Sequence, residues 1–351
     1  MRALARSLPR LAARIPWVEL GEWPTPLEPM TLPARPSDPI WVKREGASHP
    51  LYGGNKIRTL EAWFGHARAR GATRIWSIGA YGSNHVVATL LHAPRANLEA
   101  GAILFPQPTS PWAVENCGAI LDTRTPIVRL RSVIEVPFVG LAIARRDRHA
   151  VVMPPGGATT VGTIGAVTAA FELAEQIDAG LAPPPARIVL PIGSTCTTAG
   201  LLAGLHLAHA VAAWRWPIPI VHGVRVTPWP VPSRTRIANL ARVTLARLAE
   251  LGGPRLHLTL FDLLSRLVVD GAELGPGYGH PTSRSELAVR TMRPLRLDGV
   301  YSAKAAAAVL RLHREGVGPL LFWATKSETV LGSPSLDARG AAPRAIIDWL
   351  R

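Results

Sequence analysis

The chain has 351 residues, a hydrophobic content of 48% and a formal net charge of +15. This length exceeds what one hydrophobic core usually holds, so we expect two lobes. There is no apolar run long enough for a membrane-spanning helix, and the two cysteines indicate neither a disulfide framework nor a metal site, which is typical of a cytoplasmic protein.

The positive charge would also suit a nucleic-acid-binding protein. The arginines, however, are spread along the chain, and there is no helix-turn-helix, zinc-finger or single-strand-binding signature. We therefore expect no nucleic-acid partner and no membrane partner. The positive field should instead attract small anions such as phosphates and carboxylates.

The chain opens with an arginine-rich segment, residues 1–15, that resembles a transit peptide but also fits an amphipathic helix belonging to the fold. Residues 23–27 are an extended, proline-rich lead-in. Apolar strands are then predicted at 40–44, 74–78, 100–105, 126–130, 151–153, 187–192, 218–226, 256–260 and 319–323. Helices are predicted at 56–70, 86–93, 112–121, 161–177, 201–213, 233–251 and 284–293, and from 300 onward. Residues 131–147 and the tail from 332 fit neither period clearly.

This alternation predicts an α/β fold with two lobes, in which helices cover both faces of parallel sheets. Ligands in such folds bind beyond the carboxyl ends of the strands. We therefore expect the site to be walled by three strand-to-helix junctions, at residues 79–85, 193–200 and 324–327.

A glycine-containing turn, Gly53-Gly54-Asn55-Lys56, opens the predicted helix at 56–70. A helix N-terminus carries a partial positive charge, so a lysine buried there loses its proton easily and becomes a nucleophile. Only four of the 39 lysines and arginines are lysines, which favours a role for the Lys56 amine. The alternative is an ordinary surface lysine at a helix start.

The turn at residues 193–200 offers hydroxyl groups and consecutive backbone N–H groups, as a phosphate cradle requires. It matches neither the Walker A motif nor Gly-x-Gly-x-x-Gly, so a small phosphorylated cofactor is favoured over a nucleotide. Taken alone, this turn is equally well explained as a helix cap, and for Gly82-Ser83-Asn84-His85 a helix cap is the default explanation. Together with the Lys56 amine they suggest pyridoxal 5′-phosphate, which forms a Schiff base with lysine.

With these motifs the chain resembles the D-cysteine desulfhydrase and 1-aminocyclopropane-1-carboxylate deaminase family, within the tryptophan synthase beta-like (fold type II) pyridoxal-phosphate enzymes. The resemblance covers about residues 16–328. It is carried by the segments 53–61, 83–85, 154–157, 193–200, 275–279 and 297–305. It implies a large cofactor-binding domain of residues 1–55 plus 160–351, a small domain of residues 56–159, and a homodimer.

The resemblance also implies roles for individual residues. Lys56 holds the cofactor and moves the α-proton of the substrate, while Asn84 bonds the ring oxygen of the cofactor. Ser83, Asn84 and His85 bind the substrate, Ser83 also being catalytic, and Tyr278 and Tyr301 are acid–base or nucleophilic groups. The cofactor phosphate is bound by Gly193, Ser194, Thr195, Cys196, Thr197 and Thr198. Thr325 faces the pyridine nitrogen, with Ser302 nearby, and no metal is expected.

Several positions depart from the family pattern. Thr195-Cys196 stands where Gly-Gly or Gly-Ser is usual, Thr59 where a lysine often reaches the phosphate, and Thr325-Lys326-Ser327 where Thr-Gly-Gly is usual. Ala303 and Gly82 also replace a usual glycine and glutamine. These departures concern the phosphate geometry and the substrate range.

The function implied is a pyridoxal-phosphate-dependent lyase acting on a small amino-acid substrate. D-cysteine desulfhydrase-type β-elimination, giving an α-keto acid, ammonia and sulfide, is favoured because Ser302 follows Tyr301, where the deaminase branch tends to have glutamate. The alternatives are 1-aminocyclopropane-1-carboxylate deaminase and a catalytically degenerate homologue that binds the cofactor without turnover.

Overall fold

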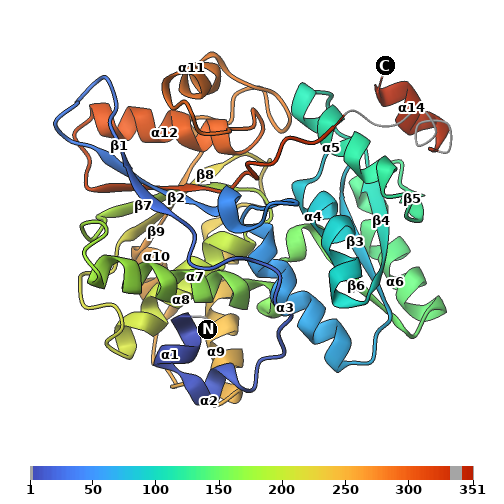
Figure 1. Ribbon diagram of the computed structural model, residues 1–351, viewed down its shortest axis with the longest axis horizontal. Coiled ribbons are helices and arrows are strands. Elements are labelled where there is room, and N and C mark those ends of the chain that lie inside the picture. The colour runs from blue at the N-terminus through green and yellow to red at the C-terminus, as the bar shows by residue number, and fades with distance from the viewer. Residues whose placement is uncertain (1–2, 333–341, 351) are drawn as a thin grey trace.

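The computed structural model describes residues 3–332 and 342–350, and its strands form two separate sheets (Figure 1). The 6-stranded sheet has the order β1-β2-β10-β7-β8-β9, and the 4-stranded sheet has the order β5-β4-β3-β6. Neighbouring strands are parallel throughout, except that β1 pairs with β2 in the antiparallel direction. The predicted α/β architecture with parallel sheets is confirmed.

The strands of the larger sheet are β1 (Leu27–Met30), β2 (Ile40–Arg44), β7 (Arg187–Ile192), β8 (Ile220–Arg225), β9 (Leu267–Asp270) and β10 (Leu320–Ala324). Those of the smaller sheet are β3 (Arg74–Ala80), β4 (Glu99–Phe105), β5 (Ile127–Arg129) and β6 (Ala150–Met153).

The α-helices are α1 (Ala3–Ser7), α2 (Pro9–Ala12), α3 (Lys56–Ala69), α4 (Asn84–His92), α5 (Pro111–Asp122), α6 (Val136–Arg146), α7 (Thr160–Asp178), α8 (Cys196–Ala210), α9 (Arg234–Glu250), α10 (Leu260–Ser265), α11 (Ser283–Thr291), α12 (Ser302–Arg314) and α14 (Arg344–Leu350). Short 3-10 turns include η1 (Glu45–Ser48), η3 (Val133–Glu135) and η4 (Pro155–Gly157). Within the described residues, no helix is long and apolar enough to cross a membrane.

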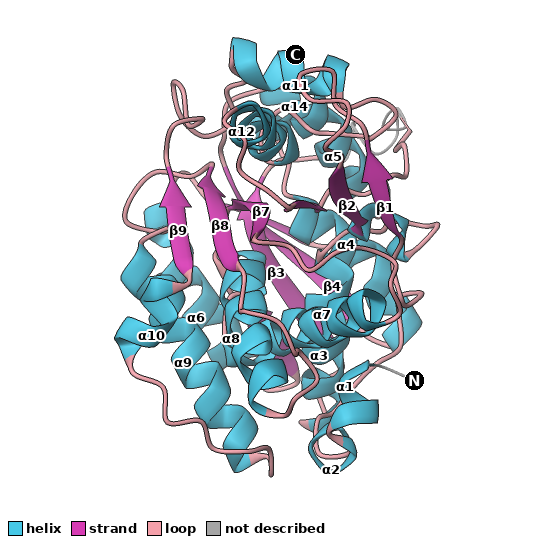
Figure 2. Cartoon of the chain, turned by 90° about the vertical axis from the view of Figure 1, so that its left-hand side faces the viewer, coloured by secondary structure: helices cyan, strands magenta, loops and turns pink. Residues whose placement is uncertain are grey.

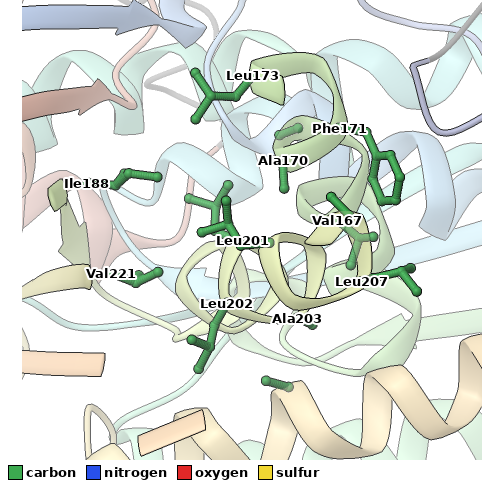
Figure 3. Packing of buried hydrophobic residues seen from close by; sticks show 14 of the residues in the cluster. Val167, Ala170, Phe171, Leu173, Ile188, Leu201, Leu202, Ala203, Leu207 and Val221 are labelled. Atoms are coloured by element: carbon green, nitrogen blue, oxygen red, sulfur yellow. The ribbon is translucent and has the colours of Figure 1, made fainter. Parts of the chain in front are cut away.

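Both faces of the larger sheet are buried. Successive residues of a strand point to opposite faces, so neighbours in one strand join different cores. In β7, Ile188 and Leu190 join the hydrophobic core formed with α7, α8 and α9, whereas Val189 joins the core formed with α12. Figure 2 shows α12 on one side of the sheet and α7, α8 and α9 on the other. Figure 3 shows residues of the first of these cores, among them Val167 and Phe171 of α7 and Leu201 of α8. This two-sided burial explains the nearly continuous apolar run of β7.

The smaller sheet is covered in the same way. Leu104 of β4 packs in the core that includes α3, α4 and α5, and its neighbour Ile103 packs in the core against α6. The segment 131–147, whose structure was not assigned from the sequence, forms η3 and α6 on this second face.

Four sequence predictions need correction. Residues 256–259 lie outside regular structure and α10 begins at Leu260, so the strand predicted at 256–260 is wrong; β9 occupies the place beside β8. The segment around Leu27 is not only a lead-in, because Leu27–Met30 forms the edge strand β1. Helix α8 begins at Cys196, five residues before the predicted start, and the amphipathic N-terminal segment is two short helices because Pro9 opens the second.

Candidate active site

A cavity of about 690 Å³ lies at the carboxyl ends of β3, β7 and β10. Its lining includes Arg131 and Arg236, in keeping with the expected attraction for anions. Apart from Ser302, it also includes every residue that the sequence predicted for the site: Lys56, Ser83, Asn84, His85, Gly193, Ser194, Thr195, Cys196, Thr197, Thr198, Tyr278, Tyr301 and Thr325. The three predicted junctions therefore meet around one cavity, as parallel-sheet topology requires.

Lys56 is the first residue of α3, and the turn before it can be built only with glycine. Gly54 has φ +103°, and a Cβ there would lie 2.8 Å from the carbonyl oxygen of Thr325. The close approach lets the Asn55 N–H donate to that same carbonyl at 3.3 Å, which ties the start of α3 to the end of β10. Burial lowers the pKa of the Lys56 amine, so the neutral, nucleophilic form is more accessible than in water.

A second glycine turn encloses Lys56 from the end of β6. Gly156 has φ +66°, and a Cβ there would lie 2.1 Å from the Ser194 hydroxyl and 3.5 Å from Nζ of Lys56. Any side chain at this position would therefore block the space between the lysine and the turn after β7.

The turn after β7 presents a helix N-terminus to the cavity. Cys196, Thr197 and Thr198 form the first turn of α8, where the backbone N–H groups have no intrahelical acceptor. Thr195, just before the helix, is held at φ +74°, and its Oγ1 is buried without a hydrogen-bond partner among the described residues. These donors suit a bound anion.

Of the residues predicted at the start of α4, Ser83 makes a helix-capping hydrogen bond, whereas the ring nitrogens of His85 make none among the described residues. The Ser83 hydroxyl accepts a hydrogen bond from the Val86 N–H at 3.4 Å, which is an ordinary N-cap. Both ring nitrogens of His85 are buried without a partner in the described part of the chain. Burial, reinforced by the charge of Lys56, holds the pKa of His85 well below its usual value, so this imidazole is neutral.

The amide of Asn84 has a defined orientation. Its Oδ1 accepts hydrogen bonds from the Tyr52 hydroxyl at 2.8 Å, from Asn116 Nδ2 at 2.9 Å and from Lys326 Nζ at 2.9 Å. These contacts leave the Nδ2 group of Asn84 as the donor for a ligand in the cavity.

Tyr278 and Tyr301 form a hydroxyl pair in the cavity wall, with 2.7 Å between their oxygens and the rings edge to face. Burial raises the pKa of Tyr278 to about 12 and that of Tyr301 well above its usual value. Both phenols are therefore neutral at physiological pH and can pass a proton along their shared hydrogen bond. Gly193 makes room for this pair, because a Cβ there would lie 2.9 Å from the Tyr301 ring.

Residues 18–318 match the model of a protein family described as pyridoxal-phosphate dependent enzymes. The chain belongs to this family. It is 33% identical to nocardicin C-9′ epimerase of Nocardia uniformis subsp. tsuyamanensis over 332 residues, which cover 91% of this chain and 94% of that protein. It is 30% identical to D-cysteine desulfhydrase of Salmonella paratyphi C over 361 residues, covering 93% and 96% of the two chains. A putative 1-aminocyclopropane-1-carboxylate deaminase of Pyrococcus abyssi is 29% identical, with coverage of 87% and 89%.

Solved structures confirm the fold of this pyridoxal-phosphate enzyme. A 1-aminocyclopropane-1-carboxylate deaminase homologue superimposes with a TM-score of 0.73 at 27% identity, covering 94% of this chain and 95% of that one. The T.th. threonine deaminase superimposes with a TM-score of 0.58 at 16% identity, covering 94% and 98%. The expected tryptophan synthase beta-like, fold type II architecture and its cofactor, pyridoxal 5′-phosphate, are thus established.

The residues of the cavity fit this cofactor. The backbone N–H groups at the N-terminus of α8 and the buried Thr195 hydroxyl lack a hydrogen-bond acceptor. A phosphate group would supply this acceptor. The half-buried Lys56 amine, whose pKa is lowered, supplies the nucleophile that a pyridoxal aldehyde requires. Asn84 Nδ2 offers a donor for a ring oxygen.

Two of the residues that depart from the family pattern, Thr59 and Cys196, are in contact. Thr59 Oγ1 lies 3.8 Å from Cys196 Sγ, and this thiol also lies 3.6 Å from the carbonyl oxygen of Gly157. Arg58 does not replace the missing phosphate lysine, because its guanidinium is buried and paired with Glu45 and Glu172. Ser302 does not line the cavity; its hydroxyl donates to Asp298 Oδ2 at 2.9 Å, and Asp298 in turn accepts from the Tyr301 N–H at 2.7 Å. Ser302 therefore holds the turn that places Tyr301.

Sequence reasoning missed three residues around Asn84: Tyr52, Asn116 and Lys326. Lys326 carried a signal, since it is one of four lysines and stands where the family usually has glycine. The described residues contain no group of three side chains suited to a metal ion.

Proposed function

We propose that this enzyme is a lyase of the D-cysteine desulfhydrase type, which eliminates a β-substituent from a small amino acid. The observation that carries the proposal is the presence, in one cavity, of a half-buried lysine amine whose pKa is lowered by desolvation and a neutral tyrosine pair. Elimination needs a base for the α-proton and an acid for the leaving group, and these groups supply both.

The proposed chemistry balances as D-cysteine plus water giving pyruvate, ammonia and hydrogen sulfide. The cofactor supplies an electron sink when bound. Lys56 removes the α-proton, the Cβ–S bond breaks with its electron pair on sulfur, and Tyr301 protonates that sulfur and is reprotonated by Tyr278. Solvent then returns a proton to Tyr278 and takes the proton held by Lys56. Water then converts the released enamine product to pyruvate and ammonia.

We assign the remaining residues by their donors. Ser83, Asn84 and His85, with the N-terminus of α4, hold the substrate carboxylate. Residues 193–198 hold the cofactor phosphate, and Asn84 Nδ2 bonds the ring oxygen. Thr325, which lines the cavity, faces the pyridine nitrogen with a neutral hydroxyl. A homodimer and a cytoplasmic location are part of the same proposal, and light scattering of the loaded enzyme tests the former.

Epimerisation at the α-carbon is the second candidate. It needs the same α-proton removal by one group and proton return by another, and Lys56 and Tyr301 are available in one cavity. The 33% identity to nocardicin C-9′ epimerase favours it. Deamination of 1-aminocyclopropane-1-carboxylate is a further alternative, supported by the Pyrococcus relative. Binding of the cofactor without turnover is the non-catalytic alternative.

The first test is the visible absorption band of the lysine-bound cofactor. Wild-type protein should show it, and Lys56→Ala should lose it while keeping its fold by circular dichroism. A variant that keeps the band would remove Lys56 from its proposed role.

The second test separates the reactions. Sulfide and pyruvate from D-cysteine support the proposal, whereas 2-oxobutyrate from the cyclopropane substrate alone would replace it by the deaminase. Uptake of solvent deuterium at the α-carbon of recovered, inverted amino acid without elimination would favour the epimerase. A band that responds to no amino acid in a panel would favour the non-catalytic alternative.

A further inference from the structure

Lys326 follows β10 directly and lies behind the cavity wall. Its side chain is 4% exposed and does not line the cavity. Its ammonium donates to Asn84 Oδ1 at 2.9 Å and to Asn116 Oδ1 at 3.3 Å. Asn84 does line the cavity, so it stands between this lysine and the ligand.

The ammonium fixes which end of the Asn84 amide faces the ligand. Asn116 Nδ2 donates to the carbonyl of Gly82 at 2.8 Å as well as to Asn84, so the Asn116 amide is itself oriented. A flipped Asn84 amide would place its NH₂ group against an ammonium and another NH₂ group, so that only the Tyr52 hydroxyl could accept from it. The donors behind Asn84 thus direct its Nδ2 toward the cavity.

Lys326 carries its positive charge in a buried environment. In the described part of the chain no carboxylate forms a salt bridge with it, although Asp298 and Glu115 are near enough to favour the charged form and Arg296 opposes them. Burial outweighs these effects and lowers the pKa of Lys326 to about 8, so the amine is charged at neutral pH. The adjacent Tyr52 phenol, whose pKa is raised by burial, remains neutral. A buried ammonium of this kind is unfavourable unless its hydrogen bonds compensate.

We propose that Lys326 is a positioning residue for the cofactor: it holds the Asn84 amide with Nδ2 toward the ring oxygen and strengthens that donor by polarising the amide. The proposal rests on the role assigned to Asn84 under the proposed function, but not on which reaction is catalysed.

The test is a double-mutant cycle read as the dissociation constant of pyridoxal 5′-phosphate from apoprotein. Lys326→Met should weaken binding about tenfold in the wild-type background and less than about twofold in the Asn84→Ala background. It should also shift the absorption maximum of the bound cofactor only when Asn84 is present. Lys326→Gln, which can still donate to Asn84 Oδ1, should recover part of the affinity.

Lys304→Met is the matched control, because Lys304 is also buried but donates to the carbonyls of Leu274 and Gly277 instead. Its effect on the dissociation constant should be the same with and without Asn84. If Lys326→Met does not yield folded apoprotein by circular dichroism, Lys326→Gln with and without Asn84→Ala decides in the same way, a larger loss in the wild-type background being expected.

Equal effects of Lys326→Met in both backgrounds, or no effect in either, would overturn the proposal. Wild-type affinity in Asn84→Ala would show that the role assigned to Asn84 is wrong, and the role of Lys326 falls with it. Because the measurement needs no turnover, failure of the desulfhydrase assay would leave this result intact.

Discussion

At the scale of single residues, Thr195 combines a strained backbone with an unsatisfied side chain. A β-branched residue at φ +74° is rare, because its Cβ crowds the backbone in the left-handed region. Such strain costs about 1–2 kcal/mol and is kept where it serves a ligand. The buried Oγ1, which has no partner among the described residues, suggests that the ligand is the cofactor phosphate.

Thr195→Gly should therefore stabilise the apoprotein and weaken its binding of the cofactor. Relief of strain, less the backbone entropy that glycine loses on folding, should add up to about 1 kcal/mol to the free energy of unfolding in urea. Loss of one hydrogen bond to a charged group, worth about 1.5–3 kcal/mol, should weaken cofactor binding at least about tenfold. Ala212→Gly is the control, since exposed Ala212 also has positive φ, at 58°, but lies outside the cavity lining. Unchanged cofactor affinity in Thr195→Gly would show that this hydroxyl does not bind the phosphate.

The lysines show how far single residues could be interpreted from the sequence. Their rarity indicated that they are not ordinary surface charges, and Lys43, Lys304 and Lys326 are indeed buried while Lys56 lines the cavity. What each one contacts could not be predicted. Lys326 meets an asparagine 242 positions away, and only the fold brings them together.

At the scale of elements, α3 is anchored by a buried ionic network. Arg58, one turn or less from Lys56, bonds Glu45 of η1 and Glu172 of α7, both at 2.8 Å. Lys43 of β2 shares Glu172 at 2.5 Å. Arg58 and Lys43 together lower the pKa of Glu172 to about 2, against the effect of burial, so its carboxylate stays charged. The network therefore fixes the helix that carries the candidate nucleophile.

Arg58→Met should lower the free energy of unfolding by about 3–5 kcal/mol, because it leaves Glu45 and Glu172 buried with too few positive partners. Urea unfolding of the apoprotein measures this loss. Arg68→Met, an exposed arginine on the same helix, should stay within about 0.5 kcal/mol of wild type. A similarly small loss in Arg58→Met would mean that the network holds its charges without contributing to stability.

The type of an element could be predicted wherever a periodic pattern of apolar residues extended over many positions. The boundaries of the elements could not be predicted. Alternating leucines at 256, 258 and 260 suggested a strand, but Thr259 and Asp262 form a capping box that begins α10 instead. The capping box is a local sequence signal for the start of a helix, and the spacing of the apolar residues alone does not reveal it. The edge strand β1 was missed because Pro29 lies within it, which an edge position tolerates.

At the scale of the whole molecule, the strand order of the larger sheet assembles the site. The last strand, β10, inserts between β2 and β7, which places residues 325–327 beside the turn at residues 53–55. The sequence could indicate that strand ends gather at one edge, but the position of β10 depends on which apolar faces pack best in three dimensions. The lining residues were therefore predictable and their mutual contacts were not.

Both halves of the molecule also bury a histidine whose pKa is lowered to about 4 by burial: His92 in α4 and His206 in α8. In the unfolded chain these side chains take up protons near pH 6.5. Between pH 6.5 and 4 the unfolded state thus binds more protons than the folded state, so the stability present above pH 6.5 is lost as the pH falls toward 4.

Each histidine should contribute roughly 3 kcal/mol to this loss, one pKa unit being worth about 1.4 kcal/mol. The free energy of unfolding in urea, measured from pH 7 to pH 4, should fall across this window in wild-type apoprotein. His92→Gln and His206→Gln should each flatten the curve, even where they lower stability at pH 7, because neither glutamine titrates. A wild-type curve that is flat from pH 6.5 to 4 would mean that these imidazoles protonate without unfolding the cores around them.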